Sequence, residues 1–191
     1  ILFSRNIKNI YQLRLLINDI KDCVKDRNYP IFIDEEGGRV SRLAKIIDFS
    51  LFSQEYFGKL YLRDKKKFLD IYKIYIDKVS DIFKTVGINI NTVPVLDVKR
   101  KDSHKVIGNR SFSPDSKIVT TIGNLCIDLY KKNKIFTVIK HIPGHGLAMC
   151  DSHYKIPVID KKKHELIKKD FIPFKMCKSF FAMTAHIIYK K

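Results

Sequence analysis

Short apolar runs alternate along the chain with longer stretches in which apolar residues recur every three to four positions. The runs lie at 1–4, 30–34, 88–98, 136–140 and 181–188, and each predicts a buried strand. Helical spacing predicts helices over 13–24, 68–83, 118–129 and about 161–170. Gly87 is placed to cap the end of the second helix, and Ser113 with Pro114 to begin the third.

Strands separated by helices predict an α/β protein, because parallel neighbours need a crossover of a dozen or more residues. An open doubly wound sheet and part of an eight-stranded barrel both fit this order. Ionisable residues close four successive strands: Asp34, Asp97, Lys140 with His141, and His186. A barrel directs all such ends towards one shared site, so this pattern favours the barrel.

Composition indicates one globular domain over 1–191, with 45% hydrophobic and 30% charged residues. The net charge of +17 raises a nucleic-acid-binding alternative. The basic residues are scattered over every expected helix, which favours solvated faces and no nucleic acid. No apolar run has the length of a membrane span, and four cysteines without CxxC pairing favour a reducing, cytoplasmic location.

The segment IDEEGGRVSRL (33–43) combines a strand-end acid, two glycines and two arginines. The glycines permit close approach of the backbone. Asp34 and an arginine, Arg39 or Arg42, then suit a polyhydroxyl ligand. In the loop VIGNRSF, Arg110 either orients a ligand or pairs with a carboxylate. An ordinary surface turn is the alternative for both segments.

The segment KHIPGHGLAMCDSH (140–153) carries the most proton-active groups. Lys140 and His141 end a strand and point to opposite faces unless the backbone twists there. Asp151 and His153 lie two residues apart, and a carboxylate that holds an imidazole makes an acid/base catalyst near neutral pH. A zinc site is the alternative, although its spacing matches no known metal pattern. That site would use His141, His145, Cys150 and His153.

These motifs, together with VPVLDV, PVID, DFIPF and AMTAHIIY in this order, resemble glycoside hydrolase family 3 and its bacterial β-N-acetylhexosaminidases of peptidoglycan recycling. The resemblance implies a (β/α)8 barrel, retaining hydrolysis of terminal N-acetylglucosamine, and no metal or cofactor. It implies that His153 is the general acid/base and that Asp151 orients it. The residues implied to bind the sugar are Asp34, Arg42, Arg110, Lys140 and His141.

The resemblance also implies a missing part. The family nucleophile is an aspartate on a strand after AMTAHIIY, where this chain has ended, and the first methionine is Met149. We therefore expect a fragment with about five of eight strands, inactive alone, whose missing strands a second chain would supply. A non-catalytic remnant or sugar-binding piece is the alternative.

Overall fold

The computed structural model describes residues 1–100, 106–150 and 156–190. Its main sheet contains β1 (Phe32–Ile33), β2 (Ile90–Asn91), β3 (Phe136–Ile142) and β5 (Phe181–Thr184), all parallel and in chain order. Strands that follow one another without reversal are typical of a barrel, whereas a doubly wound sheet reverses at a switch point. The predicted α/β class with parallel strands is confirmed.

Three predicted strands differ from the structure. The run 88–98 forms only the short strand β2 and an isolated parallel bridge from Val95 to Lys140. Residues 1–4 provide only a parallel bridge from Leu2 to Ile33, followed by the 3-10 turn η1 (Ser4–Asn6). The predicted strand 181–188 divides into β5 and β6 (Ile188–Tyr189), and β6 pairs with β4 (Val158–Ile159) in a separate two-stranded sheet. A local apolar run cannot reveal this division, because it depends on which strand lies alongside.

Four predicted helices are confirmed: α1 (Ile10–Cys23), α3 (Lys65–Val86), α4 (Ser116–Lys132) and α5 (Lys163–Lys168). Gly87 ends α3 with φ of 93°, as predicted. The predicted start of α4 is wrong. The N-cap is Asp115, whose side chain accepts a hydrogen bond from Lys117 N. Ser113 Oγ accepts a hydrogen bond from Asp115 N and does not cap the helix. Helices α2 (Gln54–Arg63) and α6 (Ile172–Met176) and the turn η2 (Gly108–Arg110) were not predicted.

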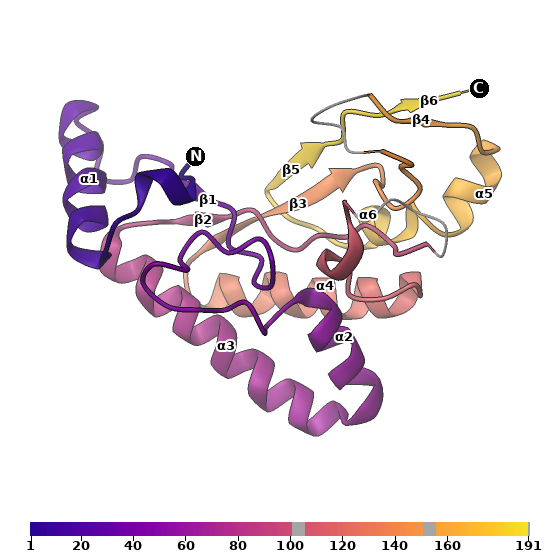
Figure 1. The fold of residues 1–191 in the computed structure, drawn as a ribbon, viewed down its shortest axis with the longest axis horizontal. Helices are drawn as coiled ribbons and strands as arrows, with labels where there is room; N and C mark the ends of the chain where they lie inside the picture. Colours follow the sequence, from indigo (N-terminus) through magenta and orange to yellow (C-terminus); the bar gives the residue numbers. More distant parts are fainter. Residues whose placement is uncertain (101–105, 151–155, 191) are drawn as a thin grey trace.

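The two faces of the sheet have different surroundings. Helices α3 and α4 contact each other beneath one face, where Asn91 Nδ2 donates to Tyr130 Oη at 3.1 Å (Figure 1). Phe32, Phe136 and Phe181 share the opposite face, with ring centroids 6.0 Å apart in two edge-on pairs. The first face therefore meets the helical core, while the second is only partly covered by the described residues.

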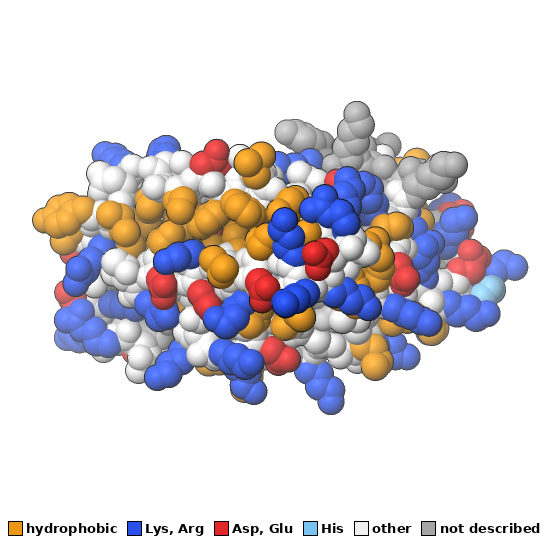
Figure 2. Space-filling view, turned by 90° about the horizontal axis from the view of Figure 1, so that it is seen from below, with side chains coloured by type: hydrophobic (Ala, Val, Ile, Leu, Met, Phe, Trp, Pro, Cys, Tyr) orange, Lys and Arg blue, Asp and Glu red, His pale blue; other side chains and the backbone are white. Residues whose placement is uncertain are grey.

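Basic side chains are dispersed on the surface. Figure 2 shows lysines and arginines spread between acidic and apolar side chains over the face seen from below. None of the four cysteines, all of which lie in the described part of the chain, forms a disulfide bond. Among the described residues, none of the helices has the length and hydrophobicity needed to cross a bilayer.

Candidate active site

A pocket of about 590 Å³ lies where the strands of the main sheet end. We call it the strand-end pocket. It brings together the five residues assigned to the sugar, and His186 also lines it. The five are Asp34, Arg42, Arg110, Lys140 and His141.

The strands explain how these side chains meet. Phe32 lies opposite Ile90 and Phe136 across the sheet, so Asp34, Thr92 and Lys140 continue the same face two or four residues later. His141 also lines the pocket, although strict alternation would turn it away. The register of β3 against β5 shifts between Lys140 and Ile142, which interrupts the alternation at that point.

Lys140 is the centre of a buried ion network. Its Nζ lies 3.1 Å from Asp34 Oδ1, 2.6 Å from Glu36 Oε1 and 2.8 Å from Thr92 Oγ1. The side chain is only 2% exposed. Three partners from two strand ends therefore hold the ammonium in one place.

Glu36 is the shared partner of Lys140 and Arg110. Arg110 Nε and Nη2 donate to the two oxygens of Glu36, each at 2.8 Å, in a bidentate pair. Burial alone would raise the pKa of Glu36, but the charges of Lys140 and Arg110 lower it to about 2. Burial alone would lower the pKa of Arg110, but the charge and hydrogen bonds of Glu36 raise it above its ordinary value. Both groups are therefore charged across the physiological range.

Asp34 joins Lys140 to Arg42. Arg42 Nη2 lies 3.2 Å from Asp34 Oδ2, and Thr92 Oγ1 donates to Oδ1. Burial opposes ionisation of Asp34, but Lys140 and Thr92 bring its pKa below the ordinary value. Arg42 Nε is buried and donates to no atom of the described residues. The carboxylate of Asp34 therefore lies beside the guanidinium of Arg42, whose Nε–H has no acceptor among the described residues.

Asp97 orients His141, one of the histidines that line the pocket. Its Oδ2 lies 2.7 Å from His141 Nδ1, and its Oδ1 accepts from His145 N at 2.5 Å. Arg110 Nη2, which only donates, lies 3.4 Å from His141 Nε2. Nε2 is then the acceptor and Nδ1–H donates to Asp97 in the neutral ring. Burial raises the pKa of Asp97, but His141 outweighs it and the net shift is downward.

The charges in and directly beneath the pocket cancel. Three cationic side chains, Arg42, Arg110 and Lys140, face three carboxylates. The carboxylates are Asp34, Glu36 and Asp97. Such an array of donors and acceptors suits the hydroxyl groups of a neutral ligand better than an anion.

The predicted acid/base pair, Asp151 and His153, lies outside the described residues. The segment before it is anchored near the pocket, because Tyr189 Oη donates to Gly144 O at 2.5 Å. His153 also belonged to the zinc alternative. Within 1–100, 106–150 and 156–190, no three His, Cys, Asp or Glu side chains are arranged to hold a metal ion.

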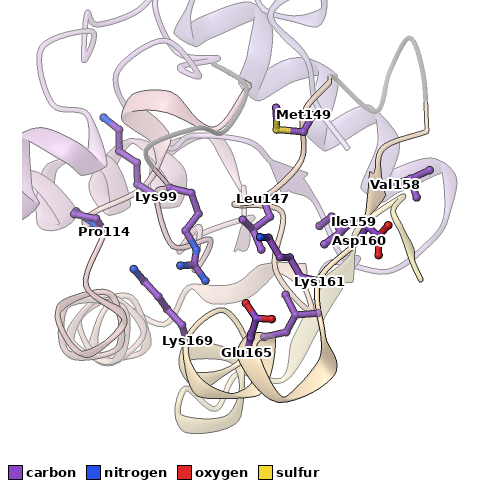
Figure 3. Close-up of a pocket in the computed structure, with 12 residues that line it drawn as sticks. Lys99, Pro114, Leu147, Met149, Val158, Ile159, Asp160, Lys161, Glu165 and Lys169 are labelled. Carbon is purple, nitrogen blue, oxygen red and sulfur yellow. The ribbon is translucent and has the colours of Figure 1, made fainter. Parts of the chain in front are cut away.

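A second pocket, of about 690 Å³, is lined by none of the residues of the strand-end pocket. Figure 3 shows Lys161 and Lys169 reaching in from different sides with Glu165 between them. Arg100, which also lines it, is paired with Asp170. Its mixture of acidic, basic and apolar side chains does not select one class of ligand.

Three residues that organise the strand-end pocket were not predicted from the sequence: Glu36, Thr92 and, as the partner that holds His141, Asp97. Glu36 carried a usable signal, because it lies two residues after Asp34 and therefore shares its side of an extended segment. Thr92 had none, since a threonine near a strand end is common.

A family model described as the glycosyl hydrolase family 3 N-terminal domain matches residues 1–191. The chain belongs to this family. It is 32% identical to a β-hexosaminidase of Hydrogenovibrio crunogenus over all of this chain and 54% of the relative. It is 31% identical to β-hexosaminidase A of Pseudoalteromonas piscicida over 99% of this chain and 32% of the relative.

Solved structures agree with the family. NagZ from Neisseria gonorrhoeae superposes with a TM-score of 0.82 at 28% identity, covering 98% of this chain and 55% of NagZ. NagZ has also been solved with N-trifluoroacetyl-D-glucosamine, and this structure superposes with a TM-score of 0.81. This likeness confirms the partial barrel predicted from the strand order. The glycosyl hydrolase family 3 chain spans about half the length of the curated β-hexosaminidases it matches, or a third in the case of Pseudoalteromonas.

Proposed function

We propose that this chain is the sugar-binding part of a retaining β-N-acetylhexosaminidase that removes terminal N-acetylglucosamine from peptidoglycan-derived muropeptides in cell-wall recycling. The observation that supports this most is the convergence of five polar side chains on one charge-balanced pocket. The curated relatives named β-hexosaminidase and the NagZ complex with a glucosamine derivative support the sugar class.

The proposed roles follow the chemistry of each group. Asp34 accepts hydrogen bonds from sugar hydroxyls, while Arg42, Arg110 and Lys140 donate to sugar oxygens, and His141 is held by Asp97 to contact the ring. His153 protonates the leaving oxygen and Asp151 holds its imidazole. The reaction is a two-step displacement in which the sugar is carried covalently by an aspartate beyond Lys191, and no cofactor takes part.

The proposal includes a partner. The outer edge of β5 has no neighbouring strand among the described residues, and Phe136, Phe180 and Phe181 are exposed beside it. A second polypeptide that supplies further strands would pair with this edge and cover these rings. Neither nucleic acid nor membrane is a proposed partner. We also propose a cytoplasmic location, since free cysteines are typical of reducing compartments.

The test is the release of p-nitrophenol from p-nitrophenyl N-acetyl-β-glucosaminide. We expect the 191-residue chain alone to be inactive and a chain extended through the next strand to be active. His153→Ala in the extended chain should remove the activity, and Glu165→Ala, on the exposed side of α5, should not. Turnover by the short chain, or full activity of His153→Ala, would contradict the proposed mechanism. An inactive extended chain that still binds N-acetyl-D-glucosamine would favour the non-catalytic alternative.

A further inference from the structure

Glu35 faces away from the strand-end pocket although both of its neighbours line it. Asp34 and Glu36 border that pocket, but Glu35 does not. Glu35 borders a cavity of about 10 Å³ on the helix-covered side, which Glu36 also reaches. Adjacent residues of an extended segment point to opposite sides, which explains the difference. Glu35 is 1% exposed and does not line the strand-end pocket, so its carboxylate does not face a ligand there.

One oxygen of Glu35 holds the segment that carries Arg42. Oε2 accepts from Ser41 Oγ at 3.1 Å, Arg42 N at 2.8 Å and Leu43 N at 2.9 Å. The backbone of Glu35 is itself fixed by Asn91, whose side chain accepts from Glu35 N at 3.0 Å and donates to Glu35 O at 2.9 Å. Glu35 therefore ties the 41–43 segment to the end of β1 and to β2.

The position of this segment matters because of what Arg42 does in the pocket. Its guanidinium reaches Asp34 at 3.2 Å and lies over the ring of Phe3, with the central carbon 5.4 Å from the ring centroid. Both contacts depend on where the backbone of Arg42 places its side chain. Within the described residues, Glu35 is the one side chain that accepts a hydrogen bond from Arg42 N.

We propose that Glu35 is a positioning residue that acts through the backbone of Arg42 and holds its guanidinium beside Asp34 at the sugar-binding end of the pocket. This inference rests on the proposed function, since Arg42 is one of the residues assigned to the sugar. Glu35 itself touches no substrate. A carboxylate is suited to this role because charge-assisted hydrogen bonds are roughly twice as strong as neutral ones.

The protonation state of Glu35 provides a readout of this role. Burial raises the pKa of Glu35 to about 7, although the hydrogen bonds from Leu43, Ser41 and Arg42 lower it. The other titratable groups around it do not change charge near neutral pH, because their pKa values are raised or, for Glu36, lowered to about 2. Those groups are Tyr72 and Tyr75 from α3, Cys126 and Tyr130 from α4, and Glu36.

The experiment uses the ¹⁵N-labelled 191-residue chain and follows the amide signals of Arg42 and Leu43 between pH 5.5 and 8.5. We expect both signals to titrate with a midpoint near 7 as Glu35 loses its proton. In Glu35→Gln, which keeps a carbonyl acceptor but never ionises, this midpoint should disappear. Glu165→Ala removes an exposed carboxyl on α5 and should leave it unchanged.

Binding of N-acetyl-D-glucosamine, measured in the same spectra at pH 8, links the role to function. In Glu35→Ala, which has no acceptor, we expect the affinity to fall about tenfold, as for a lost hydrogen bond to a charged group. Glu35→Gln should recover most of this loss. In the natural chain, the affinity should decrease as the pH falls through 7, and in Glu35→Gln it should not.

Unchanged shifts and exchange rates of the Arg42 and Leu43 amides in Glu35→Ala would overturn the proposal, whatever the sugar data. If Glu35→Ala does not fold, Glu35→Gln provides the test. Amide signals of Arg42 and Leu43 that still titrate with a midpoint near pH 7 in Glu35→Gln would overturn the proposal. A natural chain whose two amides titrate but which binds no N-acetyl-D-glucosamine supports the positioning by Glu35 and contradicts the proposed function.

Discussion

Lys140 illustrates how much of this site depends on single side chains. It separates Asp34 from Glu36, and both Lys140 and Glu36 are almost completely buried, at 2% and 1% exposure. Removing one partner of a buried ion pair leaves an uncompensated charge in a medium of low polarity. The same residue is assigned to the sugar, so stability and binding share one group.

Lys140→Ala should therefore destabilise the chain strongly. We expect a loss of about 3–5 kcal/mol in the free energy of unfolding, measured by denaturant titration. The control is Lys73→Ala, which removes an exposed pair with Asp77 and should cost less than about 1 kcal/mol. Equal losses in the two variants would show that the buried network contributes no more than a surface pair.

Glu35 predicts a dependence of stability on pH. Its pKa is raised from 4.5 to about 7, so the folded state binds a proton that the unfolded state releases between these values. This stabilisation is complete below pH 4.5 and is lost as the pH rises through 7, a change of about 3 kcal/mol. Glu35→Gln should remove this component, so the difference in unfolding free energy between the two chains should vary over that range. A difference that is constant with pH would contradict the assignment.

At the scale of elements, α2 has a positioning role that its sequence does not reveal. Gln54, at its first turn, exchanges two hydrogen bonds of 3.1 Å with the backbone of Val95 and also donates to Arg110 O. The helix thereby holds η2 and the Arg110 that it carries against the end of β2. This contact requires close packing, and a Cβ at Gly58 would lie 1.8 Å from Phe112 O.

Gly58→Ala tests this packing. In an exposed helix, alanine is more favourable than glycine by about 1 kcal/mol. Here we expect the opposite, a destabilisation of about 1–3 kcal/mol from overpacking, visible as a lower Tm. Lys59→Ala, at the next and exposed position of α2, should change Tm little. A higher Tm for Gly58→Ala would mean that α2 moves freely relative to η2.

For the whole molecule, the uncovered face of the sheet is the main liability. Phe180 is 85% exposed, and Phe136 and Phe181 are 48% and 40% exposed, beside the open edge of β5. Exposed apolar side chains next to an unpaired strand edge favour association between molecules.

We expect the isolated chain to self-associate as its concentration rises, and Phe181→Glu to suppress this association in light-scattering measurements. Tyr11→Glu places the same charge at a still more exposed aromatic residue of α1, away from this edge, and should have little effect. Equal suppression by both variants would attribute association to net charge and not to this face.

Periodicity alone determined much of the architecture. The apolar stripes of α1, α3 and α4 and the run of β3 are local patterns, and each became the predicted element. The alternation of strands and helices determined the parallel α/β class, and the residues that follow the strands indicated a shared site. The motifs from residue 33 to residue 189 also identified the family. In each case the signal is carried by residues near one another in the sequence.

Tertiary structure alone decided which groups meet. Lys140 and His141 share the pocket because the register of β3 shifts against β5, and Glu36 joins Lys140 and Arg110 from positions more than seventy residues away. Glu35 and Glu36 are identical in type and adjacent, yet one has a pKa of about 7 and the other of about 2. The physical reason is that burial and neighbouring charge act through space, and the sequence does not specify which cation or helix lies beside each carboxylate.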